Sequence, residues 1–176
     1  MARNIPPENN TSPLIKRSFA PIENEKIIIL ILGTMPGEKS LALQQYYAHP
    51  QNRFWRIIAK IADRPLPDKY EERTALLPTI GVGLWDVISS AEREGSLDNN
   101  IKNEQPNDLD RFIEEHPSLE VIAFNGKAAE KLYSKYFIRK STIHYISLPS
   151  TSPANAVFTL DTLYDKWIRE LGIYLK

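Results

Sequence analysis

A continuous apolar run, KIIILIL at residues 26–32, constrains the fold of this chain more than any other feature. Its length and its β-branched residues are typical of a central parallel strand that is covered on both faces. The run ends abruptly in GTMPG at residues 33–37, which predicts a tight loop at the carboxyl end of the strand. Ligands of open α/β sheets bind beyond these strand ends, so we expect functional residues directly after Leu32.

The chain has the size of one domain. Its 176 residues are enough for a single core that removes roughly 70% of the unfolded surface. It contains no cysteine, which excludes disulfide bonds and cysteine-ligated metals. No apolar segment approaches the roughly 20 residues that span a bilayer, and the N-terminus lacks the pattern of a secretion signal. We therefore expect a cytoplasmic protein.

The charges are balanced in number but unevenly distributed. The formal net charge is zero, so no global field points to a nucleic-acid partner. Residues 53–64 and 127–140 are rich in Lys and Arg, whereas residues 104–120 are acidic. This distribution allows one basic and one acidic face. The simpler interpretation is that these charges lie on solvated helix faces.

The order of the expected elements indicates an α/β fold. Residues 1–25 are polar and contain several prolines, so we expect a loosely attached leader before a single domain at residues 26–176. Strands are expected at residues 26–32, 119–124 and 142–148, with a short strand or buried turn at 82–88. Helices are expected at residues 53–62, 71–77, 109–115, 127–135 and 159–171. This alternation predicts a three-layer α/β/α sandwich with a short central parallel sheet.

Three strand ends of this sheet, at Gly33, Asn125 and Pro149, are expected to meet at one edge. The first of the three loops, GTMPGEKS at residues 33–40, nearly matches a nucleotide-binding P-loop. The glycine that a P-loop requires before its lysine is replaced by Glu38, whose carboxylate opposes phosphate oxygens. Pro36 also removes one backbone amide. We therefore do not interpret this segment as a triphosphate site.

Two further segments, taken together with residues 33–37, resemble the motifs of a known family. QQYYAHPQNRFW lies at residues 44–55 and LPSTSPAN at residues 148–155. In their order and in their position after predicted strands, these motifs resemble the uracil-DNA glycosylase superfamily. The chain is most similar to its hypoxanthine-DNA (deoxyinosine) glycosylase branch and more distantly similar to mismatch-specific uracil-DNA glycosylases. The resemblance covers residues 26–171.

The resemblance implies a uracil-DNA glycosylase-like fold and a DNA glycosylase. Nothing in the sequence marks Lys39 or Lys127 as a Schiff-base nucleophile, so we expect the enzyme to be monofunctional. Such an enzyme flips a deaminated base, here most of all hypoxanthine, out of DNA and hydrolyses its N-glycosidic bond. The expected partner is DNA that contains a damaged base, bound by a monomer without a cofactor, a metal or a membrane. Two alternatives stay open: a uracil or mismatch-specific glycosylase, and a nucleic-acid-binding α/β domain without catalysis.

The catalytic residue departs from the pattern of the superfamily. Many members carry an Asp or Asn third in the first loop, where this chain has Met35, which cannot position water. The hypoxanthine branch assigns the catalytic role to an asparagine farther along the chain, and Asn52 matches that position. An asparagine before a helix is also a natural N-cap, so both interpretations of Asn52 stay open. In the second motif, Leu148 replaces the histidine of the standard uracil enzymes.

The resemblance also implies contacts to the base and to DNA. Base contacts are expected from Thr34, Met35, Tyr47, His49 and Asn125. DNA contacts are expected from Lys39, Arg53, Lys127, Ser150, Thr151, Ser152, Pro153, Ala154 and Asn155. Tyr47 matches the aromatic residue on which the flipped base stacks. The structural alternatives are a split of Tyr46 and Tyr47 between core and surface, a helix cap at Asn125, and a plain turn for the Ser-Pro loop.

Overall fold

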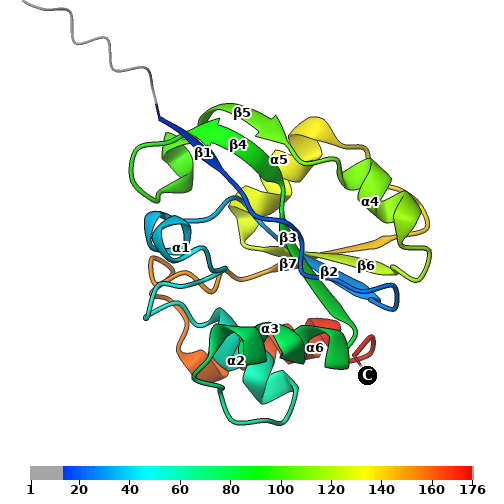
Figure 1. Cartoon of the computed structure of the whole chain (residues 1–176). Coiled ribbons are helices and arrows are strands. Elements are labelled where there is room, and N and C mark those ends of the chain that lie inside the picture. The colour runs from blue at the N-terminus through cyan, green and yellow to red at the C-terminus, as the bar shows by residue number, and fades with distance from the viewer. Residues whose placement is uncertain (1–13, 176) are drawn as a thin grey trace, which may run out of the picture.

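The structure is a computed structural model that describes residues 14–175 of the chain. Its centre is a four-stranded sheet with the order β3-β2-β6-β7, in which all three pairings are parallel (Figure 1). These strands are β2 (Ile29–Gly33), β3 (Val82–Asp86), β6 (Val121–Asn125) and β7 (His144–Leu148). The predicted parallel sheet is confirmed, and the segment interpreted as strand or turn forms the edge strand β3.

Helices cover both faces of this sheet, so the predicted α/β/α sandwich is also confirmed. One face, lower in Figure 1, is covered by α2 (Phe54–Ile61), α3 (Tyr70–Thr79) and α6 (Leu160–Leu171). The opposite face is covered by α4 (Leu109–Glu115) and α5 (Lys127–Tyr136). A further short helix, α1 (Glu38–Leu43), directly follows the loop after β2 and was not expected from the sequence.

The alternation of side chains along β2 divides the core into two clusters. Ile29 and Ile31 pack in the cluster that contains Trp167 of α6, whereas Leu30 and Leu32 pack in the cluster on the opposite face. These five side chains are fully buried. Successive residues of a strand point to opposite faces, so an uninterrupted apolar run is what a strand between two helical layers requires.

A second sheet, which was not expected from the sequence, lies on the side of α4 and α5. It is antiparallel with the order β1-β4-β5 and occupies the upper part of Figure 1. Its strands are β1 (Ile15–Arg17), β4 (Ile88–Glu92) and β5 (Lys102–Pro106), and the 3-10 turn η1 (Asp98–Asn100) connects the last two.

The position of β1 corrects the expectation of a loosely attached leader at residues 1–25. Residues 14–25 are part of the domain, because β1 pairs with β4 and Ile22 forms a bridge with Leu84 of the central sheet. Residues 1–13 lie outside the described part of the chain. The domain therefore begins before residue 26.

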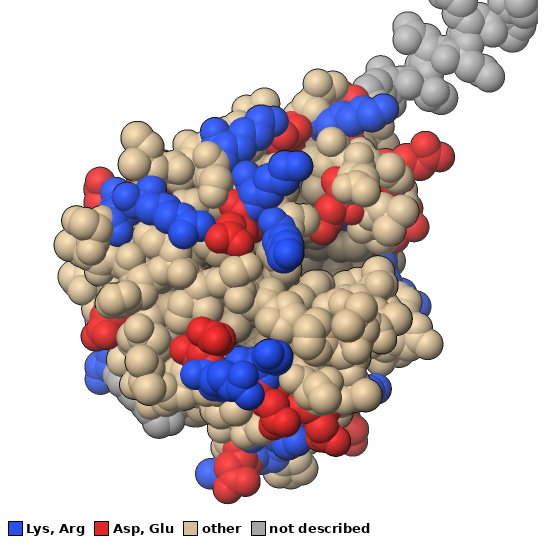
Figure 2. All heavy atoms as spheres, turned by 180° about the vertical axis from the view of Figure 1, so that it is seen from behind, with Lys and Arg blue, Asp and Glu red and all other residues tan. Residues whose placement is uncertain are grey.

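Part of the basic segment at residues 127–140 pairs with the acidic segment at residues 104–120, whereas Lys60 of the basic segment at residues 53–64 pairs with Asp161. Lys135 Nζ lies 2.6 Å from Glu104 Oε1, and Lys140 Nζ lies 3.0 Å from Asp110 Oδ1. In Figure 2, which shows the face behind that of Figure 1, Lys and Arg side chains gather over the upper half with acidic side chains between them. No helix within residues 14–175 combines the length and the apolar character needed to cross a bilayer.

Candidate active site

The carboxyl ends of the four parallel strands meet at one edge of the sheet. In the strand register, Gly33 lies opposite Asp86 on one side, and Leu32 lies opposite Phe124 on the other. Asn125, which ends β6, lies opposite Leu148. The loops that follow these strand ends bound a pocket of about 560 Å³, a volume typical of small-molecule sites. A pocket therefore lies at the sheet edge where functional residues were predicted from the sequence.

Most of the predicted site residues line this pocket. They are Thr34, Met35, Lys39, Tyr47, His49, Asn52, Asn125, Ser150, Thr151, Ser152 and Pro153. Four predicted DNA contacts, Arg53, Lys127, Ala154 and Asn155, are not among the lining residues. The structure thus brings three sequence segments together at one pocket, while the chemical role of each side chain stays a prediction.

Gly33 is required where it stands because two polar groups lie directly against it. A Cβ atom added at this position would lie 2.6 Å from Asp86 Oδ1 and 2.9 Å from the Tyr47 hydroxyl. Both distances are too short for a carbon atom. A residue without a side chain therefore lets the Asp86 carboxyl and the Tyr47 hydroxyl approach the same point at the base of the pocket.

Tyr47 combines an unusual backbone with an unpaired hydroxyl. Its φ of 53° lies in the left-handed region, which non-glycine residues seldom adopt, and its ring stacks on Phe54 at a centroid distance of 4.1 Å. The hydroxyl is buried and has no hydrogen-bond partner among the described residues. Burial, followed by the nearby Asp86 charge, raises the Tyr47 pKa. Tyr47 is therefore neutral, with a hydroxyl that is available to a ligand.

Asn52 lines the pocket and also makes the contact expected of a cap. Its Oδ1 accepts a hydrogen bond from the Phe54 backbone N–H at 3.0 Å, at the beginning of α2. Its Nδ2 makes no hydrogen bond to residues 14–175, and its Oδ1 has a second lone pair. The capping and the functional interpretation of Asn52 are therefore compatible, since the cap uses only part of the amide group.

Asn125 is held by the second motif. Its Nδ2 donates to Thr151 Oγ1 and its Oδ1 accepts from Thr151 N, both at 2.9 Å. The N-cap of α5 is Gly126, and no side chain caps the first turn of this helix. Asn125 is therefore not the helix cap that the alternative interpretation expected. A contact between Asn125 and a base must therefore share, or replace, its bonds to Thr151.

Arg53 holds the loop at residues 149–158, which contains the second motif. Its guanidinium donates to the carbonyl oxygens of Ser152 at 2.7 Å, of Asn155 at 2.8 Å and of Phe158. The sequence predicted a direct contact of Arg53 with DNA. Because these carbonyls already use the guanidinium, such a contact requires breaking bonds that shape the loop.

Short turns also shape this loop. Ser150 Oγ accepts from Ser152 N, and Ser152 Oγ accepts from Ala154 N, both at 3.2 Å. The Asn155 side chain donates to Ser150 O at 3.0 Å. The turn interpretation of the Ser-Pro loop is thus seen in the structure. It leaves each serine hydroxyl with a hydrogen atom to donate.

Three charged residues near the pocket were missed by the sequence analysis: Asp86, Arg93 and Asp98. Asp86 ends β3, is only 3% exposed, and lines the pocket together with Asp98. Asp98 Oδ1 accepts from Thr34 Oγ1 at 2.6 Å, and the buried Arg93 donates to Pro36 O, so the GTMPG loop is held from below. The signal for Asp86 was its position directly after the apolar VGLW of β3, at the same sheet edge as Asn125.

Two observations bear on nucleotides and metals. The backbone N–H of Glu38, which a P-loop would direct at phosphate, donates to Ser96 Oγ at 2.9 Å. This contact agrees with the interpretation of residues 33–40 as something other than a triphosphate site. Among residues 14–175, no group of three or more His, Asp or Glu side chains is arranged to hold a metal ion.

Known proteins of similar sequence place this chain in a family. A hypoxanthine DNA glycosylase of Methanosarcina acetivorans is 38% identical over 147 residues, which are 83% of this chain and 92% of that protein. A hypoxanthine DNA glycosylase of Methanosarcina barkeri is 40% identical over 113 residues, 64% of this chain and 72% of that protein.

A solved structure is also similar. The solution NMR structure of a candidate uracil DNA glycosylase from Methanosarcina acetivorans superposes with a TM-score of 0.76 at 36% identity, over 90% of this chain and 99% of that one. Residues 20–172 match the family model of the uracil DNA glycosylase superfamily. The resemblance seen in the motifs is confirmed: this chain belongs to the uracil DNA glycosylase superfamily.

Proposed function

We propose that this chain is a monofunctional DNA glycosylase that excises hypoxanthine from DNA. The single observation that carries the proposal is the position of Asn52 and Tyr47 in one pocket at the carboxyl edge of the sheet. The names of the relatives support hypoxanthine as the base, since both are hypoxanthine DNA glycosylases of 38–40% identity. A flipped purine nucleotide would enter this pocket and stack on Tyr47.

Hydrolysis needs a water molecule below the sugar and stabilisation of the departing base. In our proposal Asn52 positions the water through the free lone pair of Oδ1 and contacts the nucleotide through Nδ2. Met35 supplies an apolar wall, since it is 6% exposed and belongs to a core cluster. Positioning and hydrogen bonding of this kind commonly supply two to four powers of ten in rate, about 3 to 5 kcal/mol.

The DNA backbone would contact the rim of the pocket. We propose that the loop at residues 149–158, whose shape Arg53 fixes, meets the phosphates that flank the flipped nucleotide through its amides and serines. Lys39 on α1 and Lys127 at the beginning of α5 are exposed cations near the same edge. A monomer that works in the cytoplasm is part of the proposal, and analytical ultracentrifugation checks the oligomeric state.

Duplex oligonucleotides with one deoxyinosine, one deoxyuridine or no damaged base test this function. We expect strand breaks at deoxyinosine only after alkaline treatment, because a monofunctional enzyme leaves an abasic site. Uracil release without hypoxanthine release would instead support the uracil or mismatch alternative. DNA binding without release of any base, at high protein concentration and long incubation, would support a domain without catalysis.

A further inference from the structure

The two carboxylate oxygens of Asp86 differ in their surroundings. Oδ2 accepts a hydrogen bond from Ser18 Oγ at 2.7 Å. Oδ1 lies against Gly33, where the Tyr47 hydroxyl also lies, and no donor within residues 14–175 bonds to it. Asp86 lines the pocket although only 3% of the residue is exposed. Asp86 Oδ2 is thus bonded to the protein, whereas Asp86 Oδ1 is available to a ligand in the pocket.

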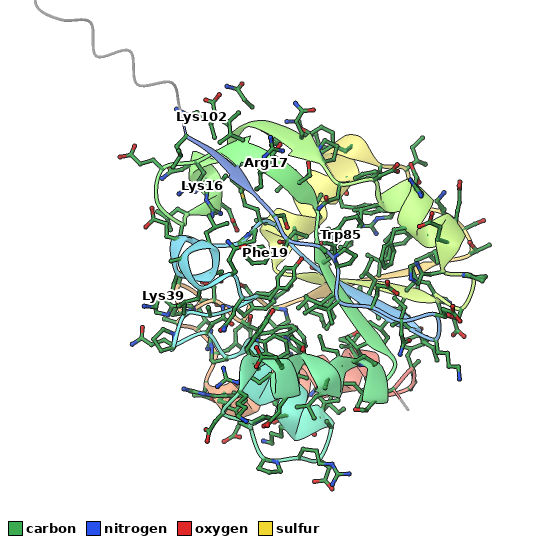
Figure 3. The ribbon with its side chains drawn as sticks, viewed as in Figure 1. Lys16, Arg17, Phe19, Lys39, Trp85 and Lys102 are labelled. Carbon is green, nitrogen blue, oxygen red and sulfur yellow. The ribbon has the colours of Figure 1, made fainter. Side chains whose placement is uncertain are left out.

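The bond from Ser18 depends on a well-anchored segment. Ser18 N donates to Ser89 O of β4 at 2.8 Å, and the next residue, Phe19, accepts from Trp85 Nε1 at 3.0 Å through its carbonyl. Figure 3 shows the labelled side chains of Phe19 and Trp85 close together below the second sheet. The segment that follows β1 therefore fixes the orientation of the Asp86 carboxyl from outside the pocket.

The charges around Asp86 leave its protonation state finely balanced. The pKa of Asp86 is raised to about 7. Burial is the largest cause, the Ser18 hydrogen bond opposes it by lowering the pKa, and the charge of Asp98 raises the pKa further. Arg93, from the end of β4, lowers it, and the other titratable neighbours, Tyr46 and Tyr47, are neutral because burial raises their own pKa values. Near neutral pH both the acid and the carboxylate are populated, as general acid catalysis requires.

Hypoxanthine carries an acceptor that uracil lacks. Its imidazole ring presents N7, and cleavage of the bond between N9 and C1′ leaves an electron pair that N7 can absorb as a proton arrives. A base that stacks on Tyr47 would lie over the face of its ring, and the hydroxyl end of this ring lies against Gly33, as does Asp86 Oδ1. We propose that Asp86 is a second catalytic residue, the general acid that protonates N7 of the departing purine; this inference rests on the proposed hypoxanthine excision.

The bond between N9 and C1′ breaks with both electrons going to the purine, and the proton on Asp86 Oδ1 moves to N7, so the base leaves as neutral hypoxanthine. Water forms the new bond to C1′ and releases one proton to solvent. The Asp86 carboxylate then regains a proton from solvent. No further reactant is required.

Single-turnover excision by wild type and by Asp86→Asn tests the role. The substrates are three duplexes that contain deoxyinosine, 7-deaza-2′-deoxyinosine, which carries carbon in place of N7, or deoxyuridine. Asparagine keeps the shape of aspartate and can still accept from Ser18, but it cannot transfer an acidic proton. We expect Asp86→Asn to slow deoxyinosine excision by about a hundredfold, within the range of general acid catalysis. Any excision of 7-deaza-deoxyinosine or deoxyuridine should change by less than about threefold, since neither base offers N7.

The pH profile separates catalysis from a structural role. Wild-type excision of deoxyinosine should fall as the pH rises through about 7, following the Asp86 pKa. Ser18→Ala removes the bond that lowers this pKa, so it should move the decline to higher pH. Asp110→Asn, on the exposed side of α4, is the matched control and should keep the wild-type profile.

Two results would overturn the assignment. One is deoxyinosine excision by Asp86→Asn at the wild-type rate, with the wild-type pH profile. The other is an equal loss on deoxyinosine and on 7-deaza-deoxyinosine, because a structural defect slows both. In either case wild type still excises hypoxanthine and the proposed function stands. If wild type releases no hypoxanthine, the proposed function fails, and the role of Asp86 fails with it.

Discussion

The side chain of Asn125 and the residue Thr151 hold each other through two hydrogen bonds of 2.9 Å, one in each direction. Thr151 is fully buried, and Asn125 is 9% exposed. The pair joins the end of β6 to the loop at residues 149–158, 26 positions along the chain. The second motif is thereby fastened to the sheet edge where the first motif also lies.

Thr151→Val is expected to destabilise the protein by about 1–3 kcal/mol, because it leaves the buried Asn125 amide without its acceptor. Urea denaturation followed by circular dichroism measures the change. Thr151→Ser keeps the hydroxyl and should cost about 1 kcal/mol or less, since it loses only a methyl group. Equal stability of wild type and Thr151→Val would contradict the importance of this bond.

Arg53→Lys is expected to loosen the loop at residues 149–158. Lysine keeps the charge but cannot donate in a fork to the carbonyls of Ser152, Asn155 and Phe158. Amide exchange in this loop should become about tenfold faster, which corresponds to about 1.4 kcal/mol of local stability, and excision should fall with it. Arg111→Lys, whose arginine is exposed and pairs with Glu115, is the control. Unchanged exchange together with weaker DNA binding would favour a direct contact between Arg53 and DNA.

Tyr47→Phe should lower the activity without lowering the stability of the fold. The Tyr47 hydroxyl is buried without a partner, so its removal should leave the free energy of unfolding unchanged or raise it by about 1 kcal/mol. If the hydroxyl bonds to the flipped nucleotide, kcat/KM for deoxyinosine should fall by about tenfold, the value of one hydrogen bond. A parallel loss of stability and activity would mean that the hydroxyl serves the fold.

Stability should depend on pH through Asp86. Folding raises its pKa to about 7, so the folded state binds the proton more tightly than the unfolded chain does. The resulting stabilisation is complete below the unfolded pKa, near 4, and is lost as the pH rises through 7. Between pH 5 and pH 8 wild type should therefore lose about 2–3 kcal/mol relative to Asp86→Asn. Urea denaturation of both proteins at the two pH values measures this, and an equal response would show that the Asp86 pKa is not raised.

The central sheet and its helices could be predicted because they are built from long periodic patterns. Two patterns are long and regular enough to identify a strand and a helix from one sequence. They are the apolar run that contains β2 and the helical spacing of Phe54, Ile57, Ile58 and Ile61. The second sheet could not be predicted in this way. Its strands have the sequences IKR, ISSAE and KNEQP, which are short and largely polar. They form a sheet only in the folded structure, where β4 lies between β1 and β5 and pairs with both.

Site residues were predicted where they lie in motifs and missed where their role depends on burial. Asn52 and Tyr47 stand in a recognisable segment, and both line the pocket. Asp86 reads as an ordinary acidic residue until its burial against Gly33 is known. Arg53 was predicted to contact DNA because it lies in a motif that resembles the family, yet its guanidinium is directed at backbone carbonyls of its own chain. Only the tertiary structure distinguishes these uses of a charged group.

The most direct test of the central proposal is the single-turnover excision rate of Asn52→Ser on a deoxyinosine duplex, measured beside its free energy of unfolding. Serine can accept the Phe54 N–H in the same turn, but it has no amide to hold water and nucleotide. We expect stability within about 0.5 kcal/mol of wild type and a rate at least about a hundredfold lower. A variant that keeps both its stability and the wild-type rate would show that Asn52 only begins the helix.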